Sequence, residues 1–433
     1  MIVATWVFVA IVARSLLGSW WQPGAILSLI MAANGVGTAT FAPDYTHTLT
    51  ANIVLMAFVS AAVVGNLVAI TTVTRPRPPV TQLVRPGRQR LLLALGYVSG
   101  FTALIGTASS IGLSVAGLTS LGQLAGTAQS ATRTRYVEGL DLPLYTSLAT
   151  ALFLVFAILT TMDQVGARRV KLQYAPPFAL YFLANLLITT RAPILWLLAI
   201  MTFAVVFTVR AKLPGDSQVR FFSRRGVLSM VLLGLAVGGL FYYLQALRFG
   251  AGTSSAVVWQ RLRIYQWGNL AGFSIWFEQG RPIEADQPPG FYTFMGILDN
   301  LGLADRIPGA YNQFYRLGFD GVGNIYTAYR GLIHDFGYVG SLLFASLLGY
   351  VGGRAFARQF TEGVSLCCYV AVAAFFSYSF IASLFAYTAI LLAFLMTPVL
   401  LRFFMTDMGG DIRATSAAST DRTSNLGRQG GEP

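Results

Sequence analysis

The sequence predicts an all-α polytopic membrane protein with about 11 transmembrane helices and one large extracytoplasmic loop. Three observations support this fold class. Hydrophobic residues make up 55% of the chain and charged residues only 11%, which is too apolar for the surface of a soluble protein. Apolar runs of membrane length follow one another from Ile2 to Phe404. One hydrophilic segment, residues 247–335, interrupts these runs.

Each predicted span is a run of about 20 mostly apolar residues, the length that crosses a hydrocarbon core of roughly 30 Å as a helix. We place the spans at residues 2–17, 23–41, 49–73, 91–111, 143–162, 174–190, 192–209, 226–246, 336–353, 364–381 and 383–403.

The spans divide the chain into four parts. Residues 1–246 hold the first eight spans, and residues 247–335 form the loop in which we expect the functional site. Residues 336–404 hold the last three spans. Residues 405–433 are rich in Gly, Ser, Thr and Arg, which predicts a disordered cytoplasmic tail.

The distribution of basic residues predicts the orientation of the helices. The net charge is +13, and basic residues gather in alternate breaks, at residues 75–90, 168–171 and 210–225. Cytoplasmic loops carry an excess of Lys and Arg, so the N-terminus is expected outside and the C-terminus in the cytoplasm. Because the basic residues do not form one patch, the charge does not indicate nucleic acid as a partner.

Two features of the spans bear on function. None carries Asp, Glu, His or Lys in its middle, which argues against an ion-driven pump. Three pairs of glycines have the GxxxG spacing that lets helices approach closely. These pairs are Gly96/Gly100, Gly234/Gly238 and Gly349/Gly353.

The hydrophilic segment contains arginine and no lysine. Its arginines are Arg248, Arg261, Arg263, Arg281, Arg306, Arg316 and Arg330. A planar guanidinium binds phosphate oxygens through two parallel hydrogen bonds, whereas an ammonium is a point charge, so this pattern favours an anionic ligand such as a pyrophosphate. The alternative is that the arginines pair with the carboxylates of the same segment and hold the loop together.

Arg191 lies apart from this set, in the tight break at residues 189–193 between two apolar runs. An isolated charge at the membrane boundary needs a partner. Arg191 either reaches lipid headgroups, as long basic side chains do, or contacts a lipid pyrophosphate at the same depth.

Three groups of the outer segment are candidates to accept a proton: His334, Asp335 and Glu278. Neighbouring residues of a helix point about 100° apart, so His334 and Asp335 need not orient one another. Asp335 also has a structural interpretation, as an acidic residue at the start of the helix that begins near Phe336. The two histidines, His47 and His334, are distant in sequence, and no metal or other cofactor is expected.

Aromatic residues are frequent in the same segment, among them Trp259, Trp276 and Tyr326. They can stack on sugars or anchor the loop at the membrane surface, and residues 257–277 are expected to form a helix in that plane. No phosphate-binding P-loop, HExxH or GxSxG motif occurs, so ATP hydrolysis, zinc proteolysis and serine-hydrolase chemistry lack their usual signatures.

The stretch from Gly323 to Gly340, GNIYTAYRGLIHDFGYVG, runs directly into an apolar span. It resembles the Wzy-type O-antigen (oligosaccharide repeat-unit) polymerases, whose large outer loop re-enters the membrane in this way. The Thr-Arg-Ala-Pro break at residues 190–193 is similar to a hairpin of small residues and arginine in that family.

This resemblance implies a metal-independent glycosyltransferase in a bacterial inner membrane. It would join repeat units carried on undecaprenyl pyrophosphate into a surface polysaccharide such as O-antigen. The implied partners are the undecaprenyl-pyrophosphate-linked oligosaccharide, membrane lipid and, as a further partner, a protein that regulates chain length. The residues expected to bind the pyrophosphate and the glycan are Arg191, Arg330, Arg261, Arg263, Arg248 and Tyr326.

Other functions fit the same layout. A ligase that transfers finished polymer would share the donor arginines and differ in its acceptor. A flippase or exporter of the lipid-linked oligosaccharide would need a polar path through the bundle, which the spans do not offer. A scaffold that sets chain length would use the loop as a docking surface only.

Overall fold

The structure is a computed structural model. It describes residues 2–72, 82–85, 87–113, 126, 142–167, 170–188, 190–210, 224–249, 253–279, 287–307, 311, 313–317 and 321–407.

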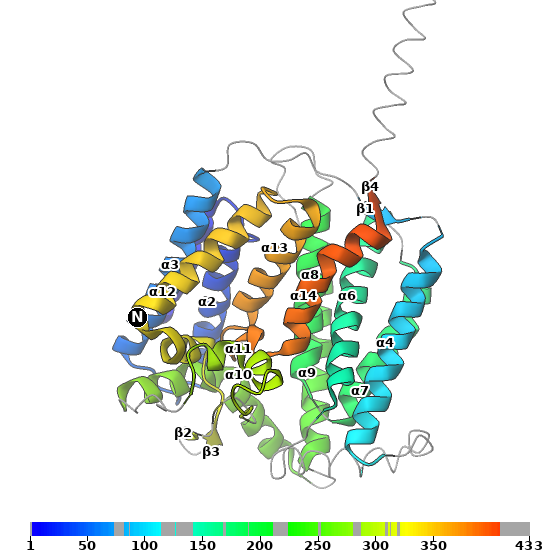
Figure 1. The fold of residues 1–433 in the computed structure, drawn as a ribbon. Coiled ribbons are helices and arrows are strands. Elements are labelled where there is room, and N and C mark those ends of the chain that lie inside the picture. Colours follow the sequence, from blue (N-terminus) through cyan, green and yellow to red (C-terminus); the bar gives the residue numbers. More distant parts are fainter. Residues whose placement is uncertain are drawn as a thin grey trace, which may run out of the picture.

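The fold is all-α, with short strands only at the two ends of the helix bundle (Figure 1). The helices are α1 (Ile2–Leu17), α2 (Pro23–Phe41), α3 (Leu49–Thr71), α4 (Gln89–Ser110), α6 (Leu144–Ala167), α7 (Ala175–Leu187), α8 (Ala192–Arg210), α9 (Arg224–Phe249), α10 (Ser255–Glu278), α11 (Phe291–Asn300), α12 (Ala328–Phe356), α13 (Glu362–Tyr378) and α14 (Thr388–Phe404). Two antiparallel pairs of strands complete it, β1 (Gln82–Val84) with β4 (Met405–Asp407) and β2 (Tyr315–Leu317) with β3 (Gly321–Gly323).

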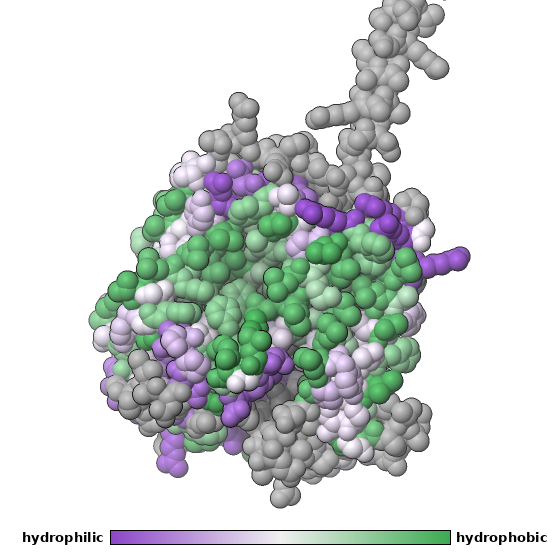
Figure 2. Space-filling model, viewed as in Figure 1, coloured by the Kyte–Doolittle hydropathy of each residue, from purple (hydrophilic) through white to green (hydrophobic). Residues whose placement is uncertain are grey.

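The helices have the length and composition of a helical membrane protein. Among the described residues, six helices are long and apolar enough to cross a membrane: α2, α3, α4, α6, α8 and α12. Three shorter helices, α1, α13 and α14, are also apolar. Figure 2 shows hydrophobic residues over the middle of the face that it draws, with hydrophilic residues towards both ends of the bundle. An apolar belt between polar ends matches a chain surrounded by lipid.

Each of the predicted spans overlaps one helix, but several boundaries differ. Helix α7 has 13 residues and is about 20 Å long, shorter than the hydrocarbon core. Helix α6 continues to Ala167, beyond the predicted end at residue 162, and so includes Asp163. Helix α9 continues to Phe249, past the predicted start of the loop at residue 247.

Helix α12 begins at Ala328, eight residues before the span predicted to start at residue 336. A kink at Gly337, with φ 65° and ψ −179°, divides it. Residues with a Cβ rarely adopt this backbone conformation, so glycine is required there. The part from Tyr338 to Phe356 is about 28 Å long, close to the thickness of a hydrocarbon core. The part after the kink is therefore long enough to span a membrane without the residues before it.

Two of the three GxxxG pairs pack as predicted. A Cβ at Gly349 would overlap the carbonyl oxygen of Ala62, because α12 packs closely along α3. A Cβ at Gly96 would meet the ring of Phe156 on α6. The prediction is wrong for Gly234 and Gly238 on α9, where a Cβ would have no heavy atom of the described residues within 4 Å.

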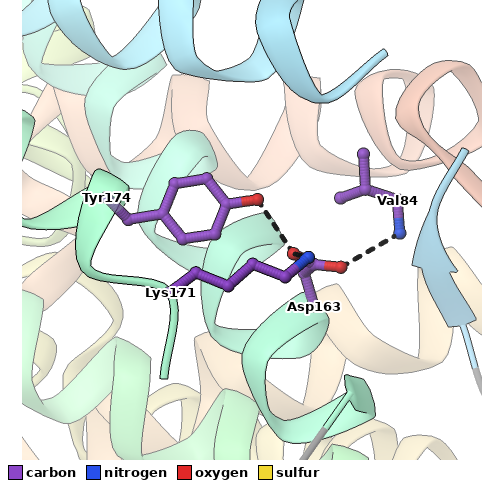
Figure 3. Close-up of polar contacts among 4 residues, drawn as sticks. All are labelled: Val84, Asp163, Lys171 and Tyr174. Atoms are coloured by element: carbon purple, nitrogen blue, oxygen red, sulfur yellow. Dashed lines mark hydrogen bonds and ion pairs between the residues drawn. The ribbon is translucent and has the colours of Figure 1, made fainter. Parts of the chain in front are cut away.

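At the end of the bundle that carries β1 and β4, a buried carboxylate ties several elements together (Figure 3). Asp163 on α6 accepts hydrogen bonds from Lys171 Nζ at 2.6 Å and from the Tyr174 hydroxyl at 2.8 Å. Its second oxygen accepts the backbone N–H of Val84 in β1 at 3.3 Å. Since β1 pairs with β4, the expected tail at residues 405–433 begins as a strand, and its remaining residues lie outside the described part of the chain.

The opposite end of the bundle carries the segment predicted as the outer loop, and the described part of this segment is mostly structured (Figure 1). The helix expected at residues 257–277 is confirmed as α10, Ser255–Glu278. It packs on α2, where the Thr38 hydroxyl donates to the carbonyl of Trp267 at 3.3 Å and Gly37 leaves room for the Trp267 ring. The loop is therefore fixed to the bundle and positions its side chains.

Candidate functional site

A cavity of about 510 Å³ lies where α8, α9, α10 and α11 meet the connection between α13 and α14. Its wall is mostly apolar and aromatic, and its charged members are Arg191, Arg263 and Arg306. No Asp or Glu is among the described residues that line it. We call it the arginine cavity, and three arginines among its described lining residues, with no Asp or Glu among them, make it suited to an anion.

Arg191 comes to the cavity through the tight break that separates α7 from α8. At the end of α7, Asn185 accepts hydrogen bonds from the backbone N–H and the hydroxyl of Thr190. Arg191 follows at the start of α8, and its guanidinium lies 4.7 Å from the Tyr265 ring and 6.0 Å from the Phe241 ring. A cation at a helix N-terminus opposes the helix dipole, so helix stability does not explain this arginine.

Arg263 and Arg261 share α10 but lie in different surroundings. Arg263 lines the cavity, forms an ion pair with Asp44 and lies 5.3 Å from the Tyr45 ring, so its charge is partly compensated. Arg261 is not among the described lining residues, and its Nη1 donates to the carbonyl of Val322 in β3 at 3.2 Å. The structure thus gives Arg261 a role in holding the β2–β3 hairpin.

Arg306 is a lining residue that the sequence did not single out from the other arginines of its segment. It follows α11, and its guanidinium lies 5.8 Å from the Tyr387 ring across the cavity wall. Only the enrichment of arginine over lysine pointed to it, because Tyr387 is distant in sequence and their contact depends on the fold.

Arg330 is fully buried at the start of α12, behind the cavity wall. Its guanidinium lies 4.1 Å from the Tyr311 ring, 4.0 Å from the Tyr326 ring and 5.3 Å from the Trp276 ring. Nη2 donates to Oε1 of Gln313 at 2.6 Å, and the Tyr326 hydroxyl donates to the backbone carbonyl of the same residue at 3.3 Å. We call the three rings the aromatic box. Two of them, Tyr311 and Tyr326, also line the arginine cavity.

His334 lies one turn after Arg330, between two aromatic rings. Its ring centre is 5.4 Å from that of Trp276 and 5.0 Å from that of Tyr292. Burial, and then the charge of Arg330, lowers the pKa of His334 to about 4. The imidazole is therefore neutral at neutral pH and can accept a proton.

Asp335 points away from His334 and holds the N-terminus of α11. Its carboxylate accepts the backbone N–H of Tyr292 at 3.1 Å, the backbone N–H of Thr293 at 2.6 Å and the Thr293 hydroxyl at 2.5 Å. Burial raises the pKa of Asp335, and these hydrogen bonds act in the opposite direction. The predicted contact with the start of α12 is wrong, because α12 begins at Ala328; the carboxylate meets the dipole of α11 instead.

The remaining candidates lie away from the cavity wall. Glu278 is the last residue of α10, is exposed, and does not line the cavity. Arg248 lies near the end of α9, and its side chain falls outside the part of the chain that the structure describes. Within that part, no three or more His, Cys, Asp or Glu side chains gather where they could hold a metal ion.

The fold and the site define the chain as a helical membrane protein with a cationic, aromatic-lined cavity at one end of the bundle. No protein-family model, curated protein or solved structure matches it.

Proposed function

We propose that this chain is a lipid-linked oligosaccharide polymerase. It would act as a metal-independent glycosyltransferase on repeat units carried by undecaprenyl pyrophosphate, at the outer face of a bacterial inner membrane. The observation that carries the proposal is the arginine cavity, whose described lining includes Arg191, Arg263 and Arg306 and no Asp or Glu. The resemblance of residues 323–340 and 190–193 to the Wzy-type polymerases adds the reaction.

The proposal includes the topology that the charge pattern predicts. Eleven spans, with the N-terminus outside and the C-terminus in the cytoplasm, would place the α10 end of the bundle, and with it the arginine cavity, at the outer surface. The strands β1 and β4 would then lie on the cytoplasmic side. A substrate that remains in the membrane through its lipid would present its pyrophosphate at the depth of Arg191.

The reaction transfers a glycosyl group between two lipid-linked substrates. A hydroxyl of the incoming unit attacks the anomeric carbon of the growing glycan, forming a new C–O bond. The bond between that carbon and the pyrophosphate oxygen breaks, undecaprenyl pyrophosphate leaves, and the hydroxyl proton passes to a base. Negative charge grows on the leaving pyrophosphate, so arginines placed against it stabilise the transition state more than the ground state.

The structure favours particular roles for the candidate residues. Arg191 and Arg306 are suited to the pyrophosphate, because both guanidinium groups line the cavity. His334 is the candidate base, because it is neutral at neutral pH and neither of its ring nitrogens has a hydrogen-bond partner among the described residues. Asp335 and Arg261 are better suited to positioning α11 and the β2–β3 hairpin than to chemistry. Tyr326 contributes both a wall of the cavity and one face of the aromatic box.

The test is polymerisation by the purified protein in liposomes supplied with synthetic undecaprenyl-pyrophosphate repeat units, read as a ladder of products. We expect Arg191→Ala and Arg306→Ala each to lower the rate by about 10- to 100-fold, the range for losing a hydrogen bond to a charged group. Arg316→Ala is the matched control, because this arginine of the same segment is exposed and does not line the cavity.

Other outcomes would contradict the proposal. No ladder from the parent protein with intact substrate would exclude a polymerase. Transfer of polymer to a different acceptor would indicate a ligase, and passage of the unit across the bilayer without a new glycosidic bond would indicate a flippase. If the arginine variants changed only the length of the products, the scaffold would be the better explanation.

A further inference from the structure

Several buried polar atoms around Arg330 have no hydrogen-bond partner among the described residues. They are Nε and Nη1 of Arg330, Nε1 of Trp276, and both ring nitrogens of His334. The Arg330 side chain is fully buried and Trp276 is 6% exposed, so water does not reach their donors freely. Leaving a buried donor unpaired is unfavourable, and such groups are uncommon in folded proteins.

These atoms belong to one cluster. The Arg330 guanidinium lies 5.3 Å from the Trp276 ring, and the Trp276 and His334 ring centres are 5.4 Å apart. The cluster is separate from the arginine cavity, since Trp276, Arg330 and His334 are not among its described lining residues. Tyr311 and Tyr326 lie between the two, because both contact Arg330 and both line the cavity.

Two other buried tryptophans differ in whether the indole N–H is paired. Nε1 of Trp196 has no partner among the described residues either, whereas Nε1 of Trp6 is paired. Trp6 is fully buried, and its Nε1 donates to Oδ1 of Asn52 at 2.9 Å. Nε1 of Trp276 has no such acceptor among the described residues. Trp276 has, in addition, the Arg330 guanidinium 5.3 Å from its ring. The contact of the Trp276 ring with Arg330 uses the face of the ring and leaves the indole N–H without a partner among the described residues. The donor and the guanidinium charge together are what an anionic oxygen would bind.

We propose that Trp276 and Arg330 form an inner subsite that binds an oxyanion, behind the tyrosine wall of the arginine cavity. Three donors, Nε and Nη1 of Arg330 and Nε1 of Trp276, bind its oxygens, and one positive charge balances its negative charge. Neutral His334 lies beside it, where a hydroxyl of the same ligand can donate to a ring nitrogen. That this oxyanion belongs to the lipid-linked substrate rests on the proposed function; the subsite itself rests on the contacts.

Two sources supply such an oxyanion, a phosphate group of the lipid carrier or a carboxylate of an acidic sugar. The test uses protein labelled with ¹⁵N-tryptophan in lipid nanodiscs and follows the indole N–H signals. Trp276→Phe identifies the Trp276 signal by its loss. Inorganic pyrophosphate is added in one arm and a methyl glucuronide in the other.

We expect the Trp276 signal to move downfield as the indole N–H binds an oxyanion, while the signal of Trp6, already paired with Asn52, stays in place. The probe that moves it at lower concentration identifies the source. Arg330→Lys retains the positive charge and loses the fixed fork of donors, so about 10-fold more probe is expected for the same shift. A Trp276 signal that neither probe moves would overturn the proposal. Because the readout involves no glycosyl transfer, this result is independent of failure in the polymerisation assay.

A stability measurement keeps the variants interpretable. Trp276→Phe removes a donor that has no partner among the described residues, so the melting temperature should hold or rise. Trp6→Phe removes the paired donor and should lower it, without affecting the response of Trp276 to either probe. A large loss of stability in Trp276→Phe would show that the indole N–H is already paired in the free protein and would contradict the subsite.

Discussion

Replacing Asp335 with Asn tests the assignment of this carboxylate to the N-terminus of α11. The carboxylate accepts hydrogen bonds from the backbone N–H groups of Tyr292 and Thr293 and from the Thr293 hydroxyl. A carboxamide keeps one acceptor oxygen and turns an NH₂ group towards the other donors. It also removes the negative charge that favours a helix N-terminus.

The expected loss follows from the contacts on Oδ2, the oxygen that accepts both the N–H and the hydroxyl of Thr293. Hydrogen bonds to charged groups contribute about 1.5–3 kcal/mol each, and α11 can relax to recover part of this. We therefore expect the free energy of local opening of α11 to fall by about 3 kcal/mol. At 1.4 kcal/mol for each factor of ten, amide exchange there should be about 100-fold faster.

The assay is hydrogen exchange measured by mass spectrometry on the purified protein, with peptides that cover Phe291–Asn300. Asp305→Asn is the control, since it makes the same chemical change at an exposed residue of the following loop. The rate of polymerisation should fall together with the protection of α11 against exchange, because this helix positions Tyr292 against His334. Unchanged protection of α11 in Asp335→Asn would refute the assignment. Lost polymerisation with unchanged protection would return Asp335 to the catalytic candidates.

Three further predictions follow from the same structure. The pKa of His334 in the folded protein lies near 4, below the ordinary 6.5, so folding stability should fall as the pH falls from about 6.5 towards 4. The rate of polymerisation should accordingly decline near pH 4 rather than near pH 6.5. A decline near pH 6.5 would contradict the buried environment of His334. Asp163→Asn removes the negative charge that pairs with Lys171 and replaces one of the two acceptor oxygens with an NH₂ group. It should lower the free energy of unfolding by about 2 kcal/mol in detergent, and an unchanged melting temperature would argue against this anchor. Gly349→Ala should destabilise the bundle by about 1–3 kcal/mol because its Cβ overlaps the backbone of α3, whereas Gly234→Ala, where a Cβ meets no heavy atom of the described residues, should be neutral or stabilising; equal effects of the two would refute the packing.

The helices could be predicted from the sequence because hydropathy and helix formation coincide inside a membrane. Each predicted span overlaps a helix, and the helix expected at residues 257–277 is α10. The prediction was wrong at the start of α12, where Arg330, His334 and Asp335 lower the hydropathy without preventing a helix. Hydropathy reports where a chain can meet lipid, and the residues before Gly337 are covered by protein instead.

The candidate site was predictable only in its chemistry. Arginine without lysine indicated an anionic ligand, and Arg191 was selected from its isolated position in a tight break. The partners of these residues depend on contacts between distant segments. Arg306 contacts Tyr387, and Arg330 contacts Gln313 and Trp276. No local sequence pattern predicts such contacts. The GxxxG spacing at Gly234 and Gly238 was misleading for the same reason. The spacing indicates that a helix has room for a close neighbour, but it does not indicate that a second helix packs there.

The kink at Gly337 separates two demands on one helix. Helix α12 has two parts, joined at a residue whose positive φ sets the angle between them. The part after Gly337 must match the thickness of the bilayer, whereas the part before it must keep Arg330 inside its aromatic box. An ordinary continuous helix would couple these demands, because lengthening it by one residue rotates everything beyond by about 100°. With the kink between them, the part before Gly337 can hold Arg330 in its aromatic box while the part after it follows α3, provided that the glycine itself is kept.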